Sequence, residues 1–301
     1  MALDCSRVWL VTGTSSGFGR RLVPSILRRG DKVIATARKI DTIQRIFTPT
    51  DSLHLLELDI SAEEATIKLK AQEALKLWGK VDVLINNAGY SLKILAEDAT
   101  LSDFQAQFQT NFYGPAALTN ALLPQMRSRR EGTIVMIGSR SSWNPIPCHV
   151  NMPGLAIYAA SKAALRVYSE TLAQELSSSG FPNIRIGIVE PSGFRTEQNV
   201  LGYPMQVPTD ADPAYDLLRA RIQTNLEALD LNQSGDPDKA VEVIVDAVRG
   251  EGQAEGKEWP LYLPLGRDAN KGVETKCVKM LTAVKDWKEI TDYLDIDEEC
   301  V

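Results

Sequence analysis

The sequence is poor in the residues that bind metals or form disulfide bridges. Among 301 residues there are two histidines and four cysteines, and the cysteines are scattered along the chain without close pairing. Structural zinc sites and disulfide frameworks both need such residues at short, regular spacings. We therefore expect no metal site, free thiols, and a reducing, cytoplasmic location.

Long hydrophobic runs and an excess of positive charge are missing as well. No stretch approaches the roughly 20 apolar residues that cross a bilayer, and the opening segment MALDCSRVWLVTG carries an early acid, unlike a secretory signal. The formal net charge of −6 disfavours a surface for nucleic acid. With 44% hydrophobic and 24% charged residues, the composition is that of a globular protein without a membrane span.

Short β-branched runs alternate with longer amphipathic segments along the chain. This alternation predicts an α/β fold with a parallel sheet. Most of the runs are almost continuously apolar, as strands covered on both faces should be. The predicted strands span residues 7–13, 32–37, 53–59, 81–87, 132–139, 184–190 and 259–265.

One domain spanning residues 1–301 is expected, with two additions. Residues 194–236 are rich in turn formers and then helical, which indicates a substrate loop or lid inserted over a site, because a strand still follows. Residues 266–301 are predicted to form a C-terminal helical extension with an acidic end. Inside predicted helices, Pro115, Pro124 and Pro24 are expected to cause kinks or breaks.

A glycine-rich turn follows the first predicted strand. The segment VTGTSSGFGR holds Gly13, Gly17 and Gly19 between that strand and the first predicted helix. Glycines let the backbone turn tightly and approach a pyrophosphate, whose charge a helix N-terminus stabilises. Purely structural glycines would give a similar pattern, but the position directly after the strand favours a dinucleotide-binding turn.

The end of the second predicted strand indicates which dinucleotide is bound. Many NAD-binding folds carry an acid there to hold the ribose hydroxyls. Here VIATARKI has Arg38 and Lys39, and no acid before Asp41. A guanidinium can bind a 2′-phosphate through paired charge-assisted hydrogen bonds, which a carboxylate would repel. A solvated basic loop is the alternative; we favour NADP(H) over NAD(H).

Five motifs together resemble the short-chain dehydrogenase/reductase family. TGTSSGFG is similar to the family's Thr-Gly-x-x-x-Gly-x-Gly cofactor turn, NNAG (86–89) to the segment that supports the central sheet, and YAASK (158–162) to its Tyr-x-x-x-Lys. Asp59 in LDI and Asn111 in QTNFYG match two further family positions. The likeness covers about residues 7–265. The resemblance implies a single Rossmann-type, doubly wound sheet of seven parallel strands with helices on both faces, in the order 3-2-1-4-5-6-7.

The resemblance also implies hydride transfer between a nicotinamide and a carbonyl/alcohol pair. FYG and NNAGYS are most similar to the 17-beta-hydroxysteroid and retinol dehydrogenase-like branch, and VEPSGFRT resembles fungal oxidoreductases. In VEPSGFRT, Ser192 stands where the family has a glycine; Thr196 is either a cofactor ligand or a helix N-cap. The cofactor contacts expected from the motifs and from the end of the second strand are Gly13, Thr14, Ser15, Ser16, Gly17, Phe18, Gly19, Arg38, Asp59, Ile60, Asn87, Ala88, Gly89, Asn111, Tyr158, Lys162, Pro191, Ser192, Gly193 and Thr196.

Tyr158 and Lys162 are the candidate proton-transfer pair. Residues four apart share one face of a helix. A tyrosine pKa is about 10 in isolation, and a nearby ammonium favours the phenolate, so Lys162 is expected to lower the pKa of Tyr158. Tyr158 would donate a proton in reduction and accept one in oxidation. The resemblance implies that Lys162 also holds the nicotinamide ribose and that Asn111 fixes a water behind the lysine.

A serine is expected to hydrogen-bond the substrate oxygen. TIVMIGS carries Ser139 to the end of the fifth strand, where the family has its serine, and Ser141 is the alternative. Nineteen residues separate Ser139 from Tyr158, about six more than in most relatives, so WNPIPCHVNMPG is predicted to form an enlarged loop at the substrate mouth. Further candidate substrate contacts are Ser141, Trp143, His149 and Tyr203.

The hypothesis is therefore an NADP(H)-dependent ketoreductase or alcohol dehydrogenase acting on a mostly apolar small molecule. Another reaction of the same residues, such as imine or enoyl reduction or epimerisation, is one alternative. A catalytically idle nucleotide-binding or scaffolding protein is another, although the intact Ser139, Tyr158, Lys162 and Asn111 disfavour it. The family commonly forms homodimers or homotetramers.

Overall fold

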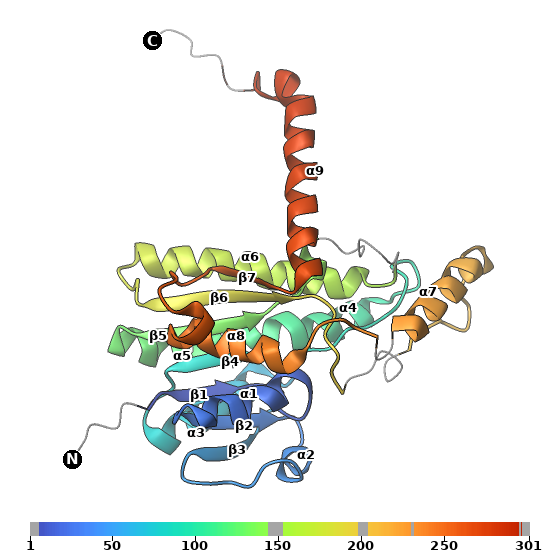
Figure 1. Cartoon of the computed structure of the whole chain (residues 1–301). Coiled ribbons are helices and arrows are strands. Elements are labelled where there is room, and N and C mark those ends of the chain that lie inside the picture. Colours follow the sequence, from blue (N-terminus) through green and yellow to red (C-terminus); the bar gives the residue numbers. More distant parts are fainter. Residues whose placement is uncertain (1–5, 144–152, 198–203, 230–231, 295, 297–301) are drawn as a thin grey trace.

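A single parallel sheet of seven strands forms the centre of the molecule (Figure 1). The computed structural model describes residues 6–143, 153–197, 204–229, 232–294 and 296. All neighbouring strands pair in parallel, in the order β3-β2-β1-β4-β5-β6-β7. The strands are β1 (Val8–Val11), β2 (Lys32–Ala37), β3 (Leu53–Glu57), β4 (Val83–Asn86), β5 (Gly132–Ile137), β6 (Ile184–Pro191) and β7 (Tyr262–Leu265). The predicted fold class and strand order are confirmed.

Helices cover both faces of this sheet, and each face has its own apolar core. On one face the core includes side chains of α3 (Glu64–Trp78), α5 (Gly114–Arg129) and α6 (Ala156–Ser178). On the other it includes side chains of α1 (Gly17–Arg28) and α8 (Pro237–Arg249). Because both faces are covered, the central strands β1, β4 and β5 are buried throughout, which explains their continuous apolar runs, whereas the edge strands β3 and β7 are partly exposed.

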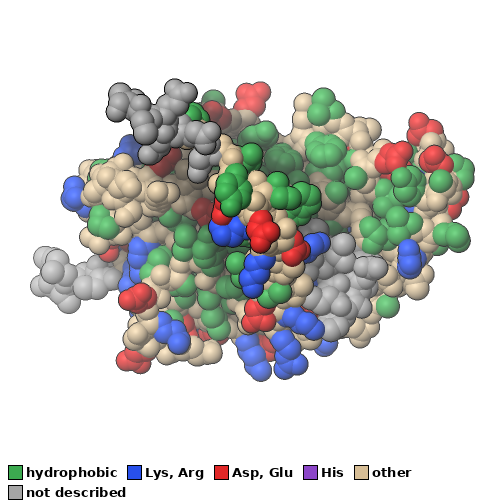
Figure 2. Space-filling view, turned by 90° about the horizontal axis from the view of Figure 1, so that it is seen from above, with side chains coloured by type: hydrophobic (Ala, Val, Ile, Leu, Met, Phe, Trp, Pro, Cys, Tyr) green, Lys and Arg blue, Asp and Glu red, His purple; other side chains and the backbone are tan. Residues whose placement is uncertain are grey.

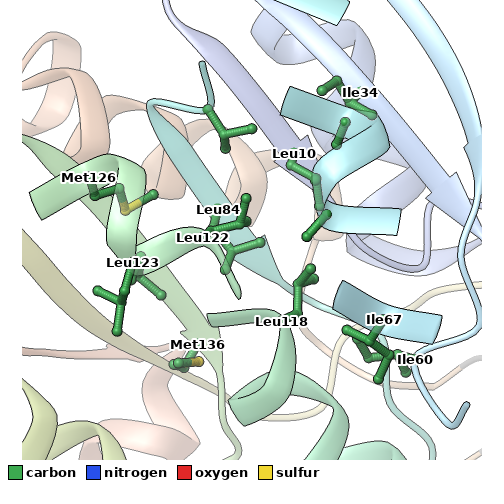
Figure 3. Packing of buried hydrophobic residues seen from close by; sticks show 14 of the residues in the cluster. Leu10, Ile34, Ile60, Ile67, Leu84, Leu118, Leu122, Leu123, Met126 and Met136 are labelled. Carbon is green, nitrogen blue, oxygen red and sulfur yellow. The ribbon is translucent and has the colours of Figure 1, made fainter. Parts of the chain in front are cut away.

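The core on the α5 face is built from interlocking aliphatic side chains (Figure 3). Leu10 of β1 and Leu84 of β4 point from the sheet toward Leu118 and Leu122 of α5, and all four are fully buried. Removing such a side chain would leave a cavity and destabilise the fold by about 2–5 kcal/mol. The sheet edge that carries the candidate site is therefore held on a rigid base.

Further helical segments complete the described part of the chain. Within the described residues, none of the helices is both long enough and apolar enough to span a membrane. The remaining segments are α2 (Ile40–Gln44), α4 (Leu101–Phe108), the π-helix η1 (Gln109–Tyr113), the 3-10 turns η2 (Arg140–Ser142), η4 (Pro213–Tyr215) and η5 (Gly252–Ala254), α7 (Asp216–Leu229) and α9 (Arg267–Thr291).

The helix prolines have milder effects than the expected breaks. Helix α1 runs through Pro24, and α5 runs through Pro124, without interruption. Pro115 lies in the first turn of α5, which continues directly from η1, so its missing N–H falls where the helix changes type. The change in helix geometry comes just before it, where η1 widens the turn between α4 and α5.

The segment between β6 and α8 leaves the sheet and returns to nearly the same point. Phe194 and Gly235 form a parallel bridge, and the N–H of Gly235 donates to the carbonyl of Gly193 at 3.1 Å. Between these two points, α7 packs against the body through a small apolar cluster that includes Met205 and Ile222. In Figure 1 this helix lies at one end of the molecule.

Candidate active site

A cleft of about 610 Å³ opens at the carboxyl ends of the central strands. Strand order reverses between β1 and β4, the point at which open α/β sheets bind their ligands. Tyr90, Thr110 and Phe194 line the cleft without having been predicted. Its predicted lining residues are Gly13, Ser15, Ser16, Gly17, Phe18, Arg38, Asp59, Ile60, Asn87, Ala88, Gly89, Tyr158, Pro191, Ser192 and Thr196.

The glycine turn is packed so tightly that two of its positions have no room for a side chain. A Cβ on Gly19 would lie 2.3 Å from the carbonyl oxygen of Gly13, and one on Gly13 would lie 2.9 Å from the Cα of Ala88. Gly13 and Gly17 also adopt φ of +70° and +58°, which side chains disfavour. The turn thus leaves its backbone bare toward the cleft, as a pyrophosphate requires.

Thr14 has a different position from the one expected of a cofactor contact. It is fully buried, and its N–H and hydroxyl donate to the carbonyl of Thr36 in β2 at 2.8 and 3.1 Å. Thr14 thereby fixes the glycine turn to the sheet. Gly193 is likewise not among the cleft residues and lies beside Gln233.

The N-terminus of α1 already holds an anionic group. The backbone N–H of Gly17 donates to the Glu197 carboxylate at 3.0 Å, and Arg21 donates to the same carboxylate at 2.8 Å. These bonds outweigh partial burial and lower the pKa of Glu197 to about 2. The helix N-terminus, with its bare glycine turn, therefore fits a negatively charged group such as a dinucleotide pyrophosphate.

The far end of the cleft carries polar groups that suit an adenosine. The Asp59 carboxylate accepts hydrogen bonds from the N–H and hydroxyl of Ser61 at 2.8 and 2.6 Å. Asn87 donates to the carbonyls of Thr12 and Gly13 at 2.8 and 3.1 Å, which ties β4 to the glycine turn. Arg38, directly after β2, is exposed at the cleft edge.

Tyr158 and Ser139 meet at the inner end of the cleft. Tyr158 lies in the first turn of α6, and Ser139 caps η2 directly after β5. Their hydroxyl groups share a hydrogen bond. Ser139 also accepts a bond from the N–H of Ser141 at 3.1 Å, so its oxygen is fixed in place. Both serines are buried, but Ser139 is the one bonded to the tyrosine.

The pKa of Tyr158 is shifted in the direction opposite to the expected one. Burial raises this pKa above its ordinary value, and the hydrogen bond with Ser139 and the positive charge of Arg140 only partly offset it. Lys162 was expected to lower the pKa, but its ammonium group donates to the carbonyl of Ile137 at 2.7 Å. Arg140, a residue that the sequence had not suggested, supplies the opposing charge.

Lys162 is a buried cation at the floor of the site. Only 5% of its surface is exposed, and this burial lowers its pKa from 10.5 to about 8. A Cβ on Gly89 would lie 3.4 Å from its Nζ and 3.0 Å from Oδ1 of Asn111. Gly89 therefore leaves room at the point where the lysine and the asparagine converge.

Asn111 is held by the π-helix η1 and by hydrogen bonds in both directions. Its Oδ1 accepts from the N–H of Tyr90 at 3.1 Å, while its Nδ2 donates to the carbonyl of Tyr90 at 3.0 Å and to the hydroxyl of Ser161 at 3.1 Å. Single-turn π-helices often occur at functional sites. The structure thus brings Asn111, Ser139, Tyr158 and Lys162 into one region.

Behind the serines lies a polar cluster that the sequence analysis missed. Glu190, at the end of β6, is almost fully buried; it accepts from the hydroxyl of Ser142 at 2.6 Å and from the indole N–H of Trp143. Burial raises the pKa of Glu190, although these bonds oppose the shift. Arg166 stacks 4.2 Å from the Trp143 ring. The sequence signal for this cluster was Glu190 itself, a charged residue in a predicted apolar strand.

The structure describes only some of the predicted substrate residues. Trp143 contacts the Glu190 cluster and the ring of Tyr262, and does not line the cofactor cleft. His149 and Tyr203 lie outside the described residues, as does most of the predicted enlarged loop.

Comparisons with known proteins agree with this geometry. The family described as short chain dehydrogenase matches residues 7–201. Oxidoreductase BOA17 of Botryotinia fuckeliana is 31% identical over 288 residues, which cover 95% of this chain and 98% of that protein. The NADP-dependent 3-hydroxy acid dehydrogenase YdfG of Shigella flexneri is 32% identical over 188 residues, 60% of this chain and 70% of that one.

A solved structure extends the likeness to the whole fold. A short-chain dehydrogenase from Streptomyces avermitilis superposes with a TM-score of 0.80 at 33% identity, covering 97% of this chain and all of that one. Its match includes the sheet and the helices around the cleft. The chain is therefore an oxidoreductase of the short-chain dehydrogenase family.

Proposed function

We propose that the chain is an NADP(H)-dependent enzyme that transfers a hydride between a nicotinamide and the carbonyl or secondary alcohol of a mostly apolar small molecule. One observation carries this proposal: the hydrogen-bonded Ser139–Tyr158 pair lies at the inner end of a cleft whose other end has a bare glycine turn. A proton donor and a nucleotide-shaped groove in one cavity are what carbonyl reduction requires.

Proton transfer would be the task of Tyr158. The bound nicotinamide supplies or accepts the hydride at the carbonyl carbon. In reduction, the raised pKa of Tyr158 keeps its hydroxyl protonated at neutral pH, ready to protonate the carbonyl oxygen. In oxidation the same oxygen takes the alcohol proton. Ser139 would orient the substrate oxygen, and the charge of Arg140 would stabilise the phenolate that remains after proton donation.

Apolar surroundings support a lipophilic substrate. Tyr90, in the cleft lining, packs against a buried cluster formed by Leu92, Ile94 and Ile157. Ile157 directly precedes the catalytic tyrosine on α6. These three side chains lie behind Tyr90 and Tyr158 and do not line the cleft themselves. They support an apolar environment beside the catalytic tyrosine, and apolar ligands gain binding free energy from such buried area.

Replacing Tyr158 by phenylalanine tests the chemistry. With NADPH and a panel of aliphatic and aromatic ketones, Tyr158→Phe should reduce kcat by about 10²–10⁴-fold, the usual contribution of general acid catalysis. NADPH binding, followed by fluorescence, should be unchanged. Unchanged turnover in the variant would show that Tyr158 is not the proton donor. A wild-type chain that binds NADPH and reduces none of the ketones would favour a nucleotide-binding role instead.

Arg38 supports the choice of NADP(H), as does the NADP dependence named for the Shigella relative. In Arg38→Asp, the carboxylate would repel a 2′-phosphate and accept bonds from free ribose hydroxyls. The dissociation constant of NADPH should rise at least tenfold, while that of NADH stays level or falls. Lys39→Asp is the matched control, because Lys39 is exposed next to Arg38 but does not line the cleft. Equal weakening of both cofactors by Arg38→Asp would refute the preference.

A further inference from the structure

Glu190 differs from the other buried acids in its bonding partners. Many acidic side chains lie at the surface, where Figure 2 shows them beside Lys and Arg on the face seen from above. Within the described ranges three acids are buried: Asp31, Asp246 and Glu190. Asp31 bonds to Arg249 and Asp246 to Arg29, each at 2.6 Å, whereas both oxygens of Glu190 accept from neutral donors. Burial without a bonded cation disfavours the carboxylate and raises its pKa, a property typical of acids at functional sites.

Strand pairing places Glu190 directly beside the residue that precedes Ser139. Strands β5 and β6 pair in register up to Ile137 and Val189, so the following positions, 138 and 190, lie side by side. The N–H of Gly138 donates to the carbonyl of Val189 at 2.7 Å, and a Cβ on Gly138 would lie 3.2 Å from Cγ of Glu190. Glycine at position 138 therefore leaves room for the Glu190 side chain to reach the turn that follows β5.

The turn η2 connects Ser139 to the two residues that Glu190 binds. The N–H of Ser141 donates to Oγ of Ser139 at 3.1 Å, and the N–H of Ser142 donates to the Ser139 carbonyl at 2.9 Å. At the other end of the turn, the Ser142 hydroxyl and the Trp143 indole N–H donate to the two oxygens of Glu190. A single 3-10 turn has few hydrogen bonds of its own. Its position therefore depends on the bonds to Glu190.

Trp143 also contacts the helix that bears Tyr158. Its ring lies 4.2 Å from the Arg166 guanidinium on α6 and packs edge-on against Tyr262 of β7, with the ring centres 5.9 Å apart. Through Trp143, Glu190 thus joins η2 to both β6 and α6, the helix whose first turn supplies the tyrosine.

We propose that Glu190 is a positioning residue that fixes the Ser139 hydroxyl against Tyr158. Resting on the proposed function, its effect on the reaction passes through Ser139, because Glu190 is not among the described residues that line the cofactor cleft. Ser139 and Tyr158 share a hydrogen bond, and misplacing a reacting group by about 1 Å can slow a reaction about 10²-fold. The alternative is a purely structural role, in which Glu190 only supports this edge of the sheet.

Two substitutions of similar size separate the hydrogen bonds of Glu190 from its charge. In Glu190→Gln the amide oxygen can accept from the Trp143 indole, and the amide N–H can donate to the Ser142 hydroxyl, which is able to accept as well as donate. Glu190→Met fills similar space and offers neither oxygen. We expect Glu190→Gln to keep kcat for ketone reduction within about threefold of the wild type, and Glu190→Met to lower it about tenfold or more. The dissociation constant of NADPH should be unchanged in both.

A double-mutant cycle tests whether Glu190 acts through Ser139. In the Ser139→Ala background the hydroxyl to be positioned is gone, so Glu190→Met should lower kcat by less than about threefold further. Fully additive losses would indicate general support of the sheet and overturn the proposal. Equal losses in Glu190→Gln and Glu190→Met would assign the effect to the charge and would also overturn it, as would an unchanged kcat in Glu190→Met.

Two further variants separate positioning from lost stability. Ile186→Ala is the matched control, because Ile186 is buried in β6 and pairs with Ile134, away from η2. It should lower the free energy of unfolding in urea and leave the kcat of the folded enzyme unchanged. Ser142→Ala removes one bond to Glu190 and little volume, so it serves if Glu190→Met does not fold. It should lower kcat about threefold or more, and an unchanged kcat would count against the proposal.

Amide hydrogen exchange at Ser141, followed by NMR, reports the position of η2 without any turnover. Exchange should quicken about tenfold or more in Glu190→Met and stay at the wild-type rate in Glu190→Gln. Unchanged exchange in Glu190→Met would show that Glu190 does not hold the turn. A wild-type chain that binds NADPH and reduces no ketone would instead contradict the proposed function, so the two failures are distinguishable.

Discussion

Replacing Lys162 by methionine should stabilise the fold at neutral pH while abolishing activity. Lys162 is buried, and its pKa is lowered from 10.5 to about 8. A difference of this size means that the charged amine is less stable in the folded chain than in the unfolded chain by about 3 kcal/mol. Methionine has nearly the same length and no charge. It leaves the Ile137 carbonyl without its donor at a cost of about 1 kcal/mol, so the net gain should be about 2 kcal/mol at pH 7.

The gain should vanish as the pH rises. Between about 8 and 10.5 the unfolded wild-type chain holds a proton on Lys162 that the folded chain has lost. Because the unfolded state then binds more protons, the stability of the wild type rises with pH across this window. Lys162→Met lacks this titration, so its advantage over the wild type should fall from pH 7 to pH 10.

Urea unfolding at pH 7, 8, 9 and 10 would measure both effects. Lys68→Met is the matched control: Lys68 is 52% exposed and pairs with Glu64 on the surface, so its replacement should change stability little and without this pH trend. If the difference between wild type and Lys162→Met is the same at pH 7 and pH 10, Lys162 is not the desolvated cation that the geometry indicates.

Two further substitutions test other parts of the site. Ser139→Ala should lower kcat by about 10²–10³-fold, as expected for the loss of a donor to the reacting oxygen, whereas Ser141→Ala should change it only a few-fold; the reverse ranking in ketone-reduction assays would assign the role to Ser141. Gly19→Ala would drive a Cβ to 2.3 Å from the Gly13 carbonyl oxygen, so NADPH affinity by fluorescence titration should fall at least tenfold, and unchanged affinity would show that the turn adjusts freely.

Local sequence patterns were sufficient to predict the strands, whereas the strand order and most of the candidate site residues came from the family resemblance. The strands are recognisable because both of their faces are covered, which makes each run continuously apolar. Tyr158 and Lys162 could be paired because helical spacing alone brings positions four apart to one face. Ser139 could be proposed because it ends a predicted strand where the resembling family has its serine, and the carboxyl ends of parallel strands converge at the ligand-binding edge.

The electrostatics of the site could not be predicted in the same way. The direction in which the Lys162 ammonium points depends on which acceptor is nearest, and Ile137 in β5 lies 25 positions away in sequence. Arg140 acts on Tyr158 because η2 turns the chain directly after Ser139, a local geometry without a sequence signature here. The Glu190 cluster likewise joins β6 to the residues after β5, through contacts 47 and 48 positions apart.

The Glu197 carboxylate would compete with a nucleotide phosphate for the backbone N–H of Gly17. This carboxylate bonds to the N–H of Gly17, which the helix geometry also offers to a pyrophosphate. Since Glu197 is part of the same chain, its effective concentration at this position is far above that of any free anion. A nucleotide that uses this N–H must therefore exchange one anion for another, and the measured affinity would report the difference between the two rather than the full strength of the phosphate contacts. Glu197 follows Thr196 at the cleft wall, so the same exchange would couple nucleotide entry to the position of residues 192–197.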